Sequence, residues 1–165
     1  MLAGLIIFSL VSAIAILGLL FSRSVDTQTE INASTEQVWE ILSEFHTYHS
    51  WNPFIIAVSG PAEAGNNISV TIKLPIGLKM NFRLLLKELS PPDEMAWTGT
   101  TLAPNILDGH HYFKIEPLSD HKVRFSQGES YRGILLFFCW PFIQWSVTRS
   151  FTEMNLALKQ RAENT

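Results

Sequence analysis

Four polar residues on two predicted strands late in the chain are spaced so that they could act on one ligand: His111, Gln127, Glu129 and Tyr131. They share the strand parity of nearby phenylalanines, so they should point to the apolar face of the sheet. Folding the hairpin about residues 118–121 brings His111 opposite Gln127 or Glu129. A His–Glu pair at the end of an apolar cavity could orient a ligand or act as acid and base. The alternative is a solvated sheet end, which we favour over a catalytic role, so no catalytic residue is assigned.

The other histidines and the cysteine offer little further chemistry. His46 and His49 lie one helical turn apart, but a third metal ligand is missing. His110 and His111 are adjacent on a strand and therefore point to opposite faces. The single cysteine, Cys139, excludes an intrachain disulfide and a cysteine-based zinc site. Phosphate-binding glycine loops, nucleophile elbows and zinc-protease motifs are missing from the sequence, and we expect neither a metal nor a cofactor.

The start of the chain is apolar. Every Asp, Glu, Lys and Arg lies at or after Arg23, and residues 2–21 contain only two serines as polar residues. A helix of this length, rising ~1.5 Å per residue, matches a bilayer core. We therefore expect a single transmembrane anchor over residues 1–22 and one domain over residues 23–165. A cleaved signal peptide is the alternative, but a basic start and a small-residue cleavage site are lacking.

Charge gives two further expectations. Arg23 follows the apolar stretch and nothing basic precedes it, which favours a membrane protein whose domain is cytoplasmic. The net charge is −3, and the Lys and Arg residues form no basic run. A nucleic-acid partner is therefore not expected.

The elements that must position these residues begin with a strand over residues 25–31, where apolar and polar positions alternate. Ser34 predicts the N-cap of a helix, and Gln37 three residues later completes a capping box. Residues 46–51 indicate a second short helical turn. Pro53 ends it, because the residue before a proline avoids helical backbone.

After Pro53 the apolar period changes to two, which predicts six more strands over residues 54–59, 68–74, 80–86, 95–99, 111–115 and 123–125. With the first strand, they form an antiparallel sheet of seven strands in an α+β fold. A long amphipathic helix follows, and Pro141 fits its first turn better than its interior. This helix is the only predicted element long enough to cover the sheet, and a curved sheet around it predicts a cavity.

The cavity should be lined by inward-facing aromatic residues and a methionine together with the polar group above. The predicted pocket residues are Trp51, Phe82, Trp97, His111, Phe113, Phe125, Gln127, Glu129, Tyr131, Phe151 and Met154. Ordinary core packing is the alternative for most of the apolar ones, because a cavity needs only some of them to line it.

Residues 134–145 form a second stretch without charge, too short to span a bilayer. Its aromatic side chains suit the headgroup boundary, so we hypothesise that it touches the membrane and forms the cavity entrance. Packing into the domain is the alternative. The predicted membrane-contact residues are Phe137, Phe138, Trp140 and Phe142.

Four stretches resemble the START-like superfamily (SRPBCC, Bet v 1-like, helix-grip fold), and specifically its polyketide cyclase/dehydrase-like branch. They are residues 31–54 (INASTEQVWEILSEFHTYHSWNPF), 108–117 (DGHHYFKIEP), 124–135 and 151–163 (FTEMNLALKQRAE). The resemblance implies a seven-stranded sheet curved around the C-terminal helix, two short helices after the first strand, and a cavity for a hydrophobic ligand. Members bind lipids, sterols or polyketides and only some are catalytic, so no catalytic residue is carried over. The N-terminal span departs from the typical soluble member.

The sequence therefore predicts a membrane-anchored protein that binds, or transfers, a lipid or another hydrophobic small molecule. One alternative is a cyclase or dehydratase of polyketide-like substrates, which requires convergent polar groups in the pocket. A second is a non-catalytic partner of a membrane protein, with a filled core. We lean against an enzyme.

Overall fold

The computed structural model describes residues 21–164. The elements, in chain order, are β1 (Ser22–Ile31), α2 (Thr35–Ser43), the 3₁₀ turn η1 (Phe45–Thr47), α3 (Tyr48–Trp51), β2 (Ile55–Ser59), β3 (Asn67–Lys73), β4 (Lys79–Ser90), β5 (Glu94–Thr101), β6 (Leu107–Ser119), β7 (Lys122–Arg132) and α4 (Leu135–Glu163). The strand β1 begins at Ser22, earlier than the alternation over residues 25–31 indicates.

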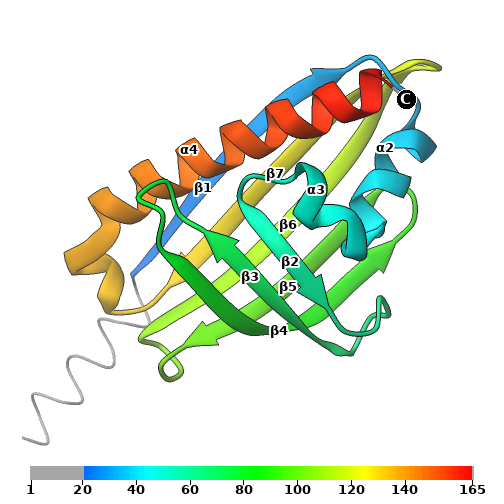
Figure 1. Ribbon diagram of the computed structural model, residues 1–165. Coiled ribbons are helices and arrows are strands. Elements are labelled where there is room, and N and C mark those ends of the chain that lie inside the picture. The colour runs from blue at the N-terminus through cyan, green and yellow to red at the C-terminus, as the bar shows by residue number, and fades with distance from the viewer. Residues whose placement is uncertain (1–20, 165) are drawn as a thin grey trace, which may run out of the picture.

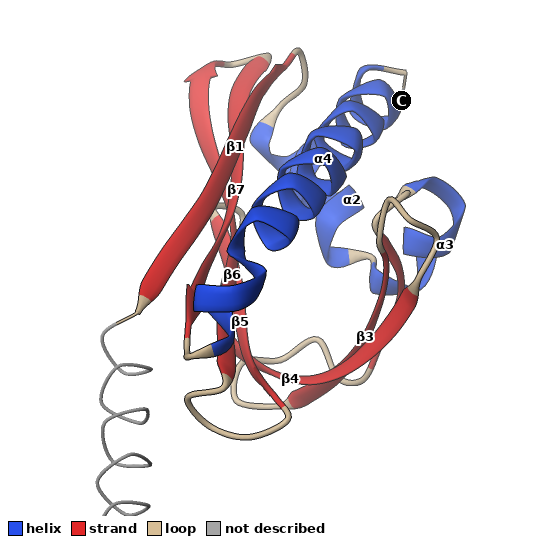
Figure 2. Cartoon of the chain, turned by 90° about the vertical axis from the view of Figure 1, so that its left-hand side faces the viewer, coloured by secondary structure: helices blue, strands red, loops and turns tan. Residues whose placement is uncertain are grey.

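The seven strands form one antiparallel sheet in the order β1-β7-β6-β5-β4-β3-β2. Neighbouring strands are consecutive in the chain except for β1, which closes against β7 at one edge. The sheet curls, and α4 lies in its concave face while α2 and α3 cover one end (Figures 1 and 2). The predicted α+β helix-grip fold, with two short helices after the first strand, is confirmed.

The predicted helix start at Ser34 is also confirmed. The backbone N–H of Gln37 donates to the Ser34 hydroxyl, and the Gln37 side chain accepts from the Ser34 N–H. This capping box satisfies two backbone donors that the first turn leaves free. The apolar face of α2 then buries Val38, Ile41 and Leu42.

The prediction that Pro141 lies in the first turn of the last helix is wrong. The helix α4 begins at Leu135, so Pro141 lies in its interior. The early start is possible because the β5–β6 loop caps it: the N–H groups of Ile134 and Leu135 donate to Asn105 O and Ile106 O at 3.1 and 3.0 Å. Pro141 removes one helical hydrogen bond, but it lies on the exposed side of the helix, where water can satisfy the freed carbonyl.

The C-terminal half of α4 holds the sheet through both apolar and polar contacts. Phe151, Met154 and Leu158 are fully buried against it. Between them, the Gln127 amide donates to Asn155 Oδ1, and the Asn155 amide donates to Thr27 Oγ1. This buried chain links β7, α4 and β1, so it fixes the register of the helix on the sheet.

The predicted transmembrane anchor over residues 1–22 falls almost entirely outside the described residues. Within residues 21–164, none of the helices has the length and apolar character needed to cross a bilayer. Phe21, the last residue of the apolar stretch, packs against the domain: its ring lies 5.7 Å from that of Phe137, and its carbonyl accepts a hydrogen bond from Gly133 N–H.

Candidate functional site

A cavity of about 300 Å³ lies between the concave face of the sheet and the N-terminal half of α4. Strands β3 to β5 supply an apolar wall that includes Ile72, Met80, Phe82, Leu84 and Trp97. The helix supplies the facing wall with Leu135, Cys139, Phe142, Ile143, Ser146 and Val147. The void therefore lies between these two walls, at the end of the sheet where α4 begins.

Three polar side chains from β6 and β7 gather at the cavity wall. His111 pairs directly with Glu129 in the register of β6 and β7. This is one of the two pairings predicted from the sequence. His111 Nδ1 lies 3.6 Å from Glu129 Oε2, and the Tyr131 hydroxyl donates to the same oxygen at 2.8 Å. All three residues line the cavity, so a ligand inside it meets a carboxylate, an imidazole and a phenol at one place.

The His111 ring is fixed by aromatic neighbours. It stacks on Trp97, with the ring centroids 5.3 Å apart. Phe113 and Phe151 make edge-to-face contacts with it, at centroid distances of 4.5 and 5.1 Å. His111 is only 4% exposed, and its Nε2 has no hydrogen-bond partner within the described part of the chain. A buried polar atom without a partner is unfavourable, so Nε2 is a natural contact point for a ligand or an ordered water.

Tyr131 is held in its neutral, donating form. Burial raises the pKa of Tyr131 well above its ordinary value, and the neighbouring Glu129 carboxylate raises it further. Both effects disfavour a phenolate, since that charge would be poorly solvated and would lie beside another negative group. The tyrosine therefore keeps its hydroxyl proton for Glu129.

Gly109 makes room for the Glu129 side chain. A Cβ atom at position 109 would lie 2.6 Å from Glu129 Oε1, closer than van der Waals contact allows. Gly109 and Gly99 are paired across β5 and β6, and both line the cavity. Gly109 thus leaves the space that the carboxylate occupies, whereas a Cβ atom at Gly99 would meet the Leu84 side chain.

The predicted pocket residues fall into two groups. The cavity is lined by Phe82, Trp97, His111, Glu129 and Tyr131. Its lining does not include the other six, which are packed in or against the core: Trp51, Phe113, Phe125, Gln127, Phe151 and Met154. In particular, Gln127 faces α4 and donates to Phe151 O.

The sequence predicts none of the α4 residues in the cavity wall as pocket residues, and it predicts Phe142 for membrane contact instead. Cys139, Phe142, Ser146 and Val147 follow one another at helical spacing on one face. The spacing was available as a signal, but it has meaning only if the helix begins before Pro141. A helix predicted to begin near Pro141 does not contain Cys139 and so does not show this face.

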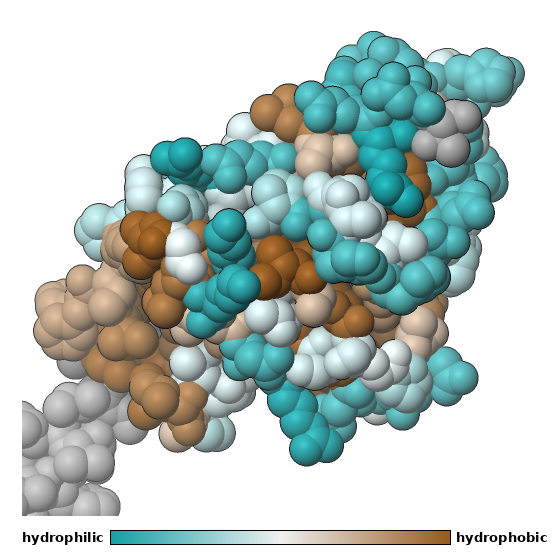
Figure 3. Space-filling model, viewed as in Figure 1, coloured by the Kyte–Doolittle hydropathy of each residue, from teal (hydrophilic) through white to brown (hydrophobic). Residues whose placement is uncertain are grey.

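Apolar side chains gather on the surface at the end of the molecule where α4 begins (Figure 3). We call this set the apolar rim: Ile76, Leu78, Leu102, Phe137, Phe138, Phe142 and Trp145. Phe138 is 72% and Leu102 is 85% exposed. The rim comes from the β3–β4 turn, the β5–β6 loop and the first turns of α4, whose neighbouring residues line the cavity. Trp140, the fourth predicted membrane-contact residue, is half-buried and contacts Tyr131.

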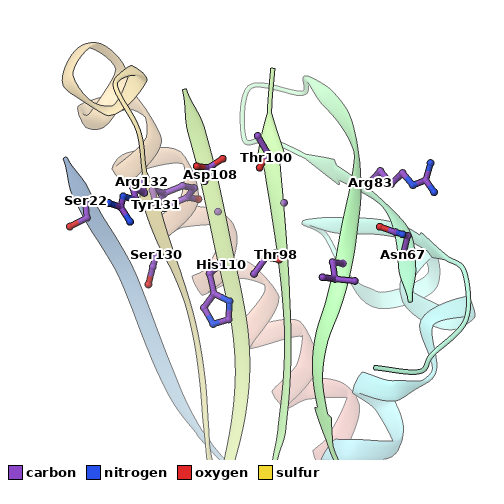
Figure 4. Close-up of a pocket in the computed structure, with 13 residues that line it drawn as sticks. Ser22, Asn67, Arg83, Thr98, Thr100, Asp108, His110, Ser130, Tyr131 and Arg132 are labelled. Atoms are coloured by element: carbon purple, nitrogen blue, oxygen red, sulfur yellow. The ribbon is translucent and has the colours of Figure 1, made fainter. Parts of the chain in front are cut away.

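A second depression, of about 580 Å³, lies on the outer face of the sheet (Figure 4). Its lining includes the polar residues Arg83, Thr98, Asp108, His110 and Arg132. His110 points to this face and His111 to the cavity, as the alternation along β6 requires. Across residues 21–164, groups of three or more side chains that could together hold a metal ion do not occur.

A curved antiparallel sheet gripping one long helix over an apolar cavity defines a START-like protein, and the predicted superfamily is confirmed. The chain belongs to the family described as polyketide cyclase / dehydrase and lipid transport, whose sequence profile matches residues 22–163. This fold supports binding of hydrophobic small molecules or cyclase activity.

Solved structures of the same fold share little sequence with the chain. A START superfamily protein from Mycobacterium smegmatis is 17% identical with a TM-score of 0.69, over 86% of this chain and 97% of that one. The Zhui aromatase/cyclase from Streptomyces sp. R1128 is 16% identical with a TM-score of 0.72, over 87% and 95%. Norcoclaurine synthase from Thalictrum flavum, in complex with dopamine and hydroxybenzaldehyde, is 11% identical with a TM-score of 0.65, over 86% of each chain. A search of the curated proteins found no match.

Proposed function

We propose that the protein binds a lipid or another hydrophobic small molecule in the cavity between the sheet and α4, while its domain is held at a membrane. The observation that carries this proposal is an apolar cavity with a cluster of polar groups in its wall. An apolar pocket with a few convergent polar groups is the usual form of a small-molecule site. A volume of about 300 Å³ is at the lower end for such sites, so a single short chain or a small ring system fits best.

The apolar rim supports the membrane part of the proposal. Exposed aromatic and aliphatic side chains on three neighbouring segments form a larger apolar surface than scattered residues would. The charge-free residues 2–21 end at Phe21, which contacts Phe137 of the rim. An apolar stretch and an apolar surface at the same end of the domain can both enter one bilayer. We propose that the domain lies on the cytoplasmic side of the membrane. The position of Arg23, shortly after the apolar residues 2–21, favours this orientation.

The ligand proposal is tested by identifying what co-purifies with the full chain. The variant Ser146→Phe places a bulky side chain in the cavity, whereas Leu156→Phe places the same side chain on the exposed face of the same helix. Mass spectrometry of extracts should find a hydrophobic compound with the wild type and with Leu156→Phe, and much less of it with Ser146→Phe. Equal amounts with all three proteins would contradict binding in this cavity.

The membrane proposal is tested with a fragment of residues 22–165, which contains the whole sheet and α4, after circular dichroism has established that it is folded. The fragment should sediment with liposomes, and Phe138→Glu should reduce the bound fraction because it places a charge in the rim. Leu156→Glu serves as the control, since Leu156 is also exposed on α4 but lies outside the rim. If the folded fragment does not bind liposomes, the proposal that the rim contacts the membrane is contradicted.

A specific observation keeps an acid–base enzyme as the second candidate. The His111 imidazole faces a carboxylate on one side, and its other nitrogen has no partner among the described residues. This is the geometry of a base that is oriented by an acid and could move a proton. Incubation of the co-purified compound with wild type and with His111→Gln tests it: conversion by the wild type alone supports an enzyme, and no conversion by either supports binding alone.

A further inference from the structure

The cavity wall carries one carboxylate and no permanent cation. Among the described residues that line it, Glu129 is the only acid, and neither Lys nor Arg occurs. Residues 1–20 cannot add a cationic side chain, because their sequence contains no Lys or Arg. The electrostatic character of the site is therefore set by Glu129 and the polar groups beside it.

His111 adds no unmatched positive charge to the cavity wall. It is the one residue of the lining that could become positively charged, and it already faces the Glu129 carboxylate at 3.6 Å. With a neutral imidazole the pair carries one negative charge, and with a protonated imidazole it carries none. In neither state does the pair offer an unmatched positive charge to an anionic ligand.

The positive charges near the cavity lie on the opposite face of the sheet. Arg83 and Arg132 line the outer depression together with His110 (Figure 4). Neither arginine belongs to the lining of the cavity. The outer face thus carries both basic groups and the Asp108 carboxylate, whereas the cavity lining carries a carboxylate without an arginine or lysine.

Neutral hydrogen-bonding groups complete the wall. His111 Nε2 and Ser146 Oγ are buried and lack hydrogen-bond partners within residues 21–164. Both residues line the cavity. A hydroxyl group on a ligand can satisfy either atom, because it can donate as well as accept.

We propose that the cavity selects hydrophobic molecules whose polar end is neutral or cationic, such as an alcohol or an amine, and rejects those that end in a carboxylate. The proposal rests on the proposed function, because it requires that the cavity binds ligands. A second carboxylate near Glu129 would be desolvated beside a like charge, which is costly in an apolar surrounding. An ammonium group would instead be paired with Glu129.

Three probes with the same chain test the selectivity: 1-octanol, octylamine and octanoate. The full chain in a nonionic detergent is treated with N-ethylmaleimide at neutral pH, and modification is followed by intact-protein mass spectrometry. Cys139 is the only cysteine and lines the cavity, so protection of its thiol reports occupancy of the cavity itself. The midpoint of thermal unfolding, which rises when a ligand binds the folded state, is the second readout.

We expect octanol and octylamine to act at concentrations at least about tenfold lower than octanoate. Glu129→Gln should bring octanoate to within about threefold of octanol and remove any advantage of octylamine. Glu153→Gln, which changes an exposed carboxylate on α4, should leave the wild-type order unchanged. Equal action of octanoate and octanol on the wild type overturns the selectivity while ligand binding stands. If none of the probes changes either readout, both the selectivity and the proposed function are contradicted.

Discussion

The Tyr131 hydroxyl donates a 2.8 Å hydrogen bond to the carboxylate of Glu129, two positions earlier on the same strand. The two side chains point to the same face because strand residues alternate. One oxygen of the carboxylate is thereby turned toward both the phenol and His111. A long acidic side chain, which could otherwise reach solvent, is held at the cavity wall.

Removing this bond should destabilise the fold modestly. Tyr131→Phe keeps the ring and deletes the donor to Glu129, so the free energy of unfolding should fall by about 1.5 kcal/mol, at the low end for bonds to charged groups. The low end applies because the Glu129 side chain remains 21% exposed. Urea denaturation measures the change. Tyr112→Phe is the matched control, since it deletes a more exposed bond to Asp26 on the outer face and should cost less.

All three tyrosines should resist ionisation in the folded protein. Burial raises the pKa of Tyr48 and of Tyr131, and burial with the hydrogen bond to Asp26 raises the pKa of Tyr112 to about 12. Unfolded tyrosines titrate near a pKa of about 10. A raised folded pKa contributes stability that is complete below the unfolded pKa and is lost as pH rises through the folded one.

Ultraviolet absorbance of the phenolate checks this prediction. The folded chain should show little phenolate at pH ~10, whereas the chain in urea should titrate all three tyrosines around that pH. The free energy of unfolding should decline above this pH. An increase in phenolate absorbance equivalent to one tyrosine near pH ~10 in the folded protein would contradict the prediction.

The buried side-chain amides of Gln127 on β7 and Asn155 on α4 should stabilise the fold by more than one hydrogen bond alone would. Asn155→Leu removes the acceptor of Gln127 and the donor to Thr27, and leaves polar atoms buried without these partners. We expect a loss of about 2 kcal/mol in the free energy of unfolding, measured in urea. Leu156→Ala, on the exposed side of the same turn, should change stability by less than about 0.5 kcal/mol. Equal losses in both variants would refute a special role for the pair.

Replacing the proline inside α4 should stabilise the domain. Pro141→Ala restores a backbone donor within the helix and removes the clash of the ring with the preceding turn. Because proline also restricts the unfolded chain, we expect a net gain of about 2 kcal/mol rather than the full helix-interior cost. Thermal unfolding measures it, with Gln144→Ala, also exposed on α4, as the control. A lower melting temperature for Pro141→Ala would show that the proline itself is required for the packing of α4.

Much of the fold could be predicted from local patterns. The capping box at Ser34 and the alternation through Phe113 and Phe125 are short-range signals, and the structure follows them. The pairing of His111 with Glu129 was predicted as one of two possibilities, because a hairpin leaves its register open until the turn is known.

The helix wall of the site could not be predicted in the same way. The start of α4 depends on carbonyl groups of the β5–β6 loop, which are distant in sequence and carry no local signal. Whether an inward aromatic side chain fills the core or lines a void also depends on what faces it. Phe113 and Phe82 look alike in the sequence, yet Phe113 stacks on Phe125 while Phe82 lines the cavity.

The hydrogen bond from Gly133 to Phe21 leaves no linker between the apolar stretch and the sheet, which begins at Ser22. A domain on a long flexible tether samples many orientations and can reach a second surface, and its local concentration at any one surface falls with tether length. With residues 2–21 in a bilayer, this domain would instead present its cavity to that bilayer in a narrow range of orientations. Such a protein would exchange its ligand with a single membrane and would not shuttle between two.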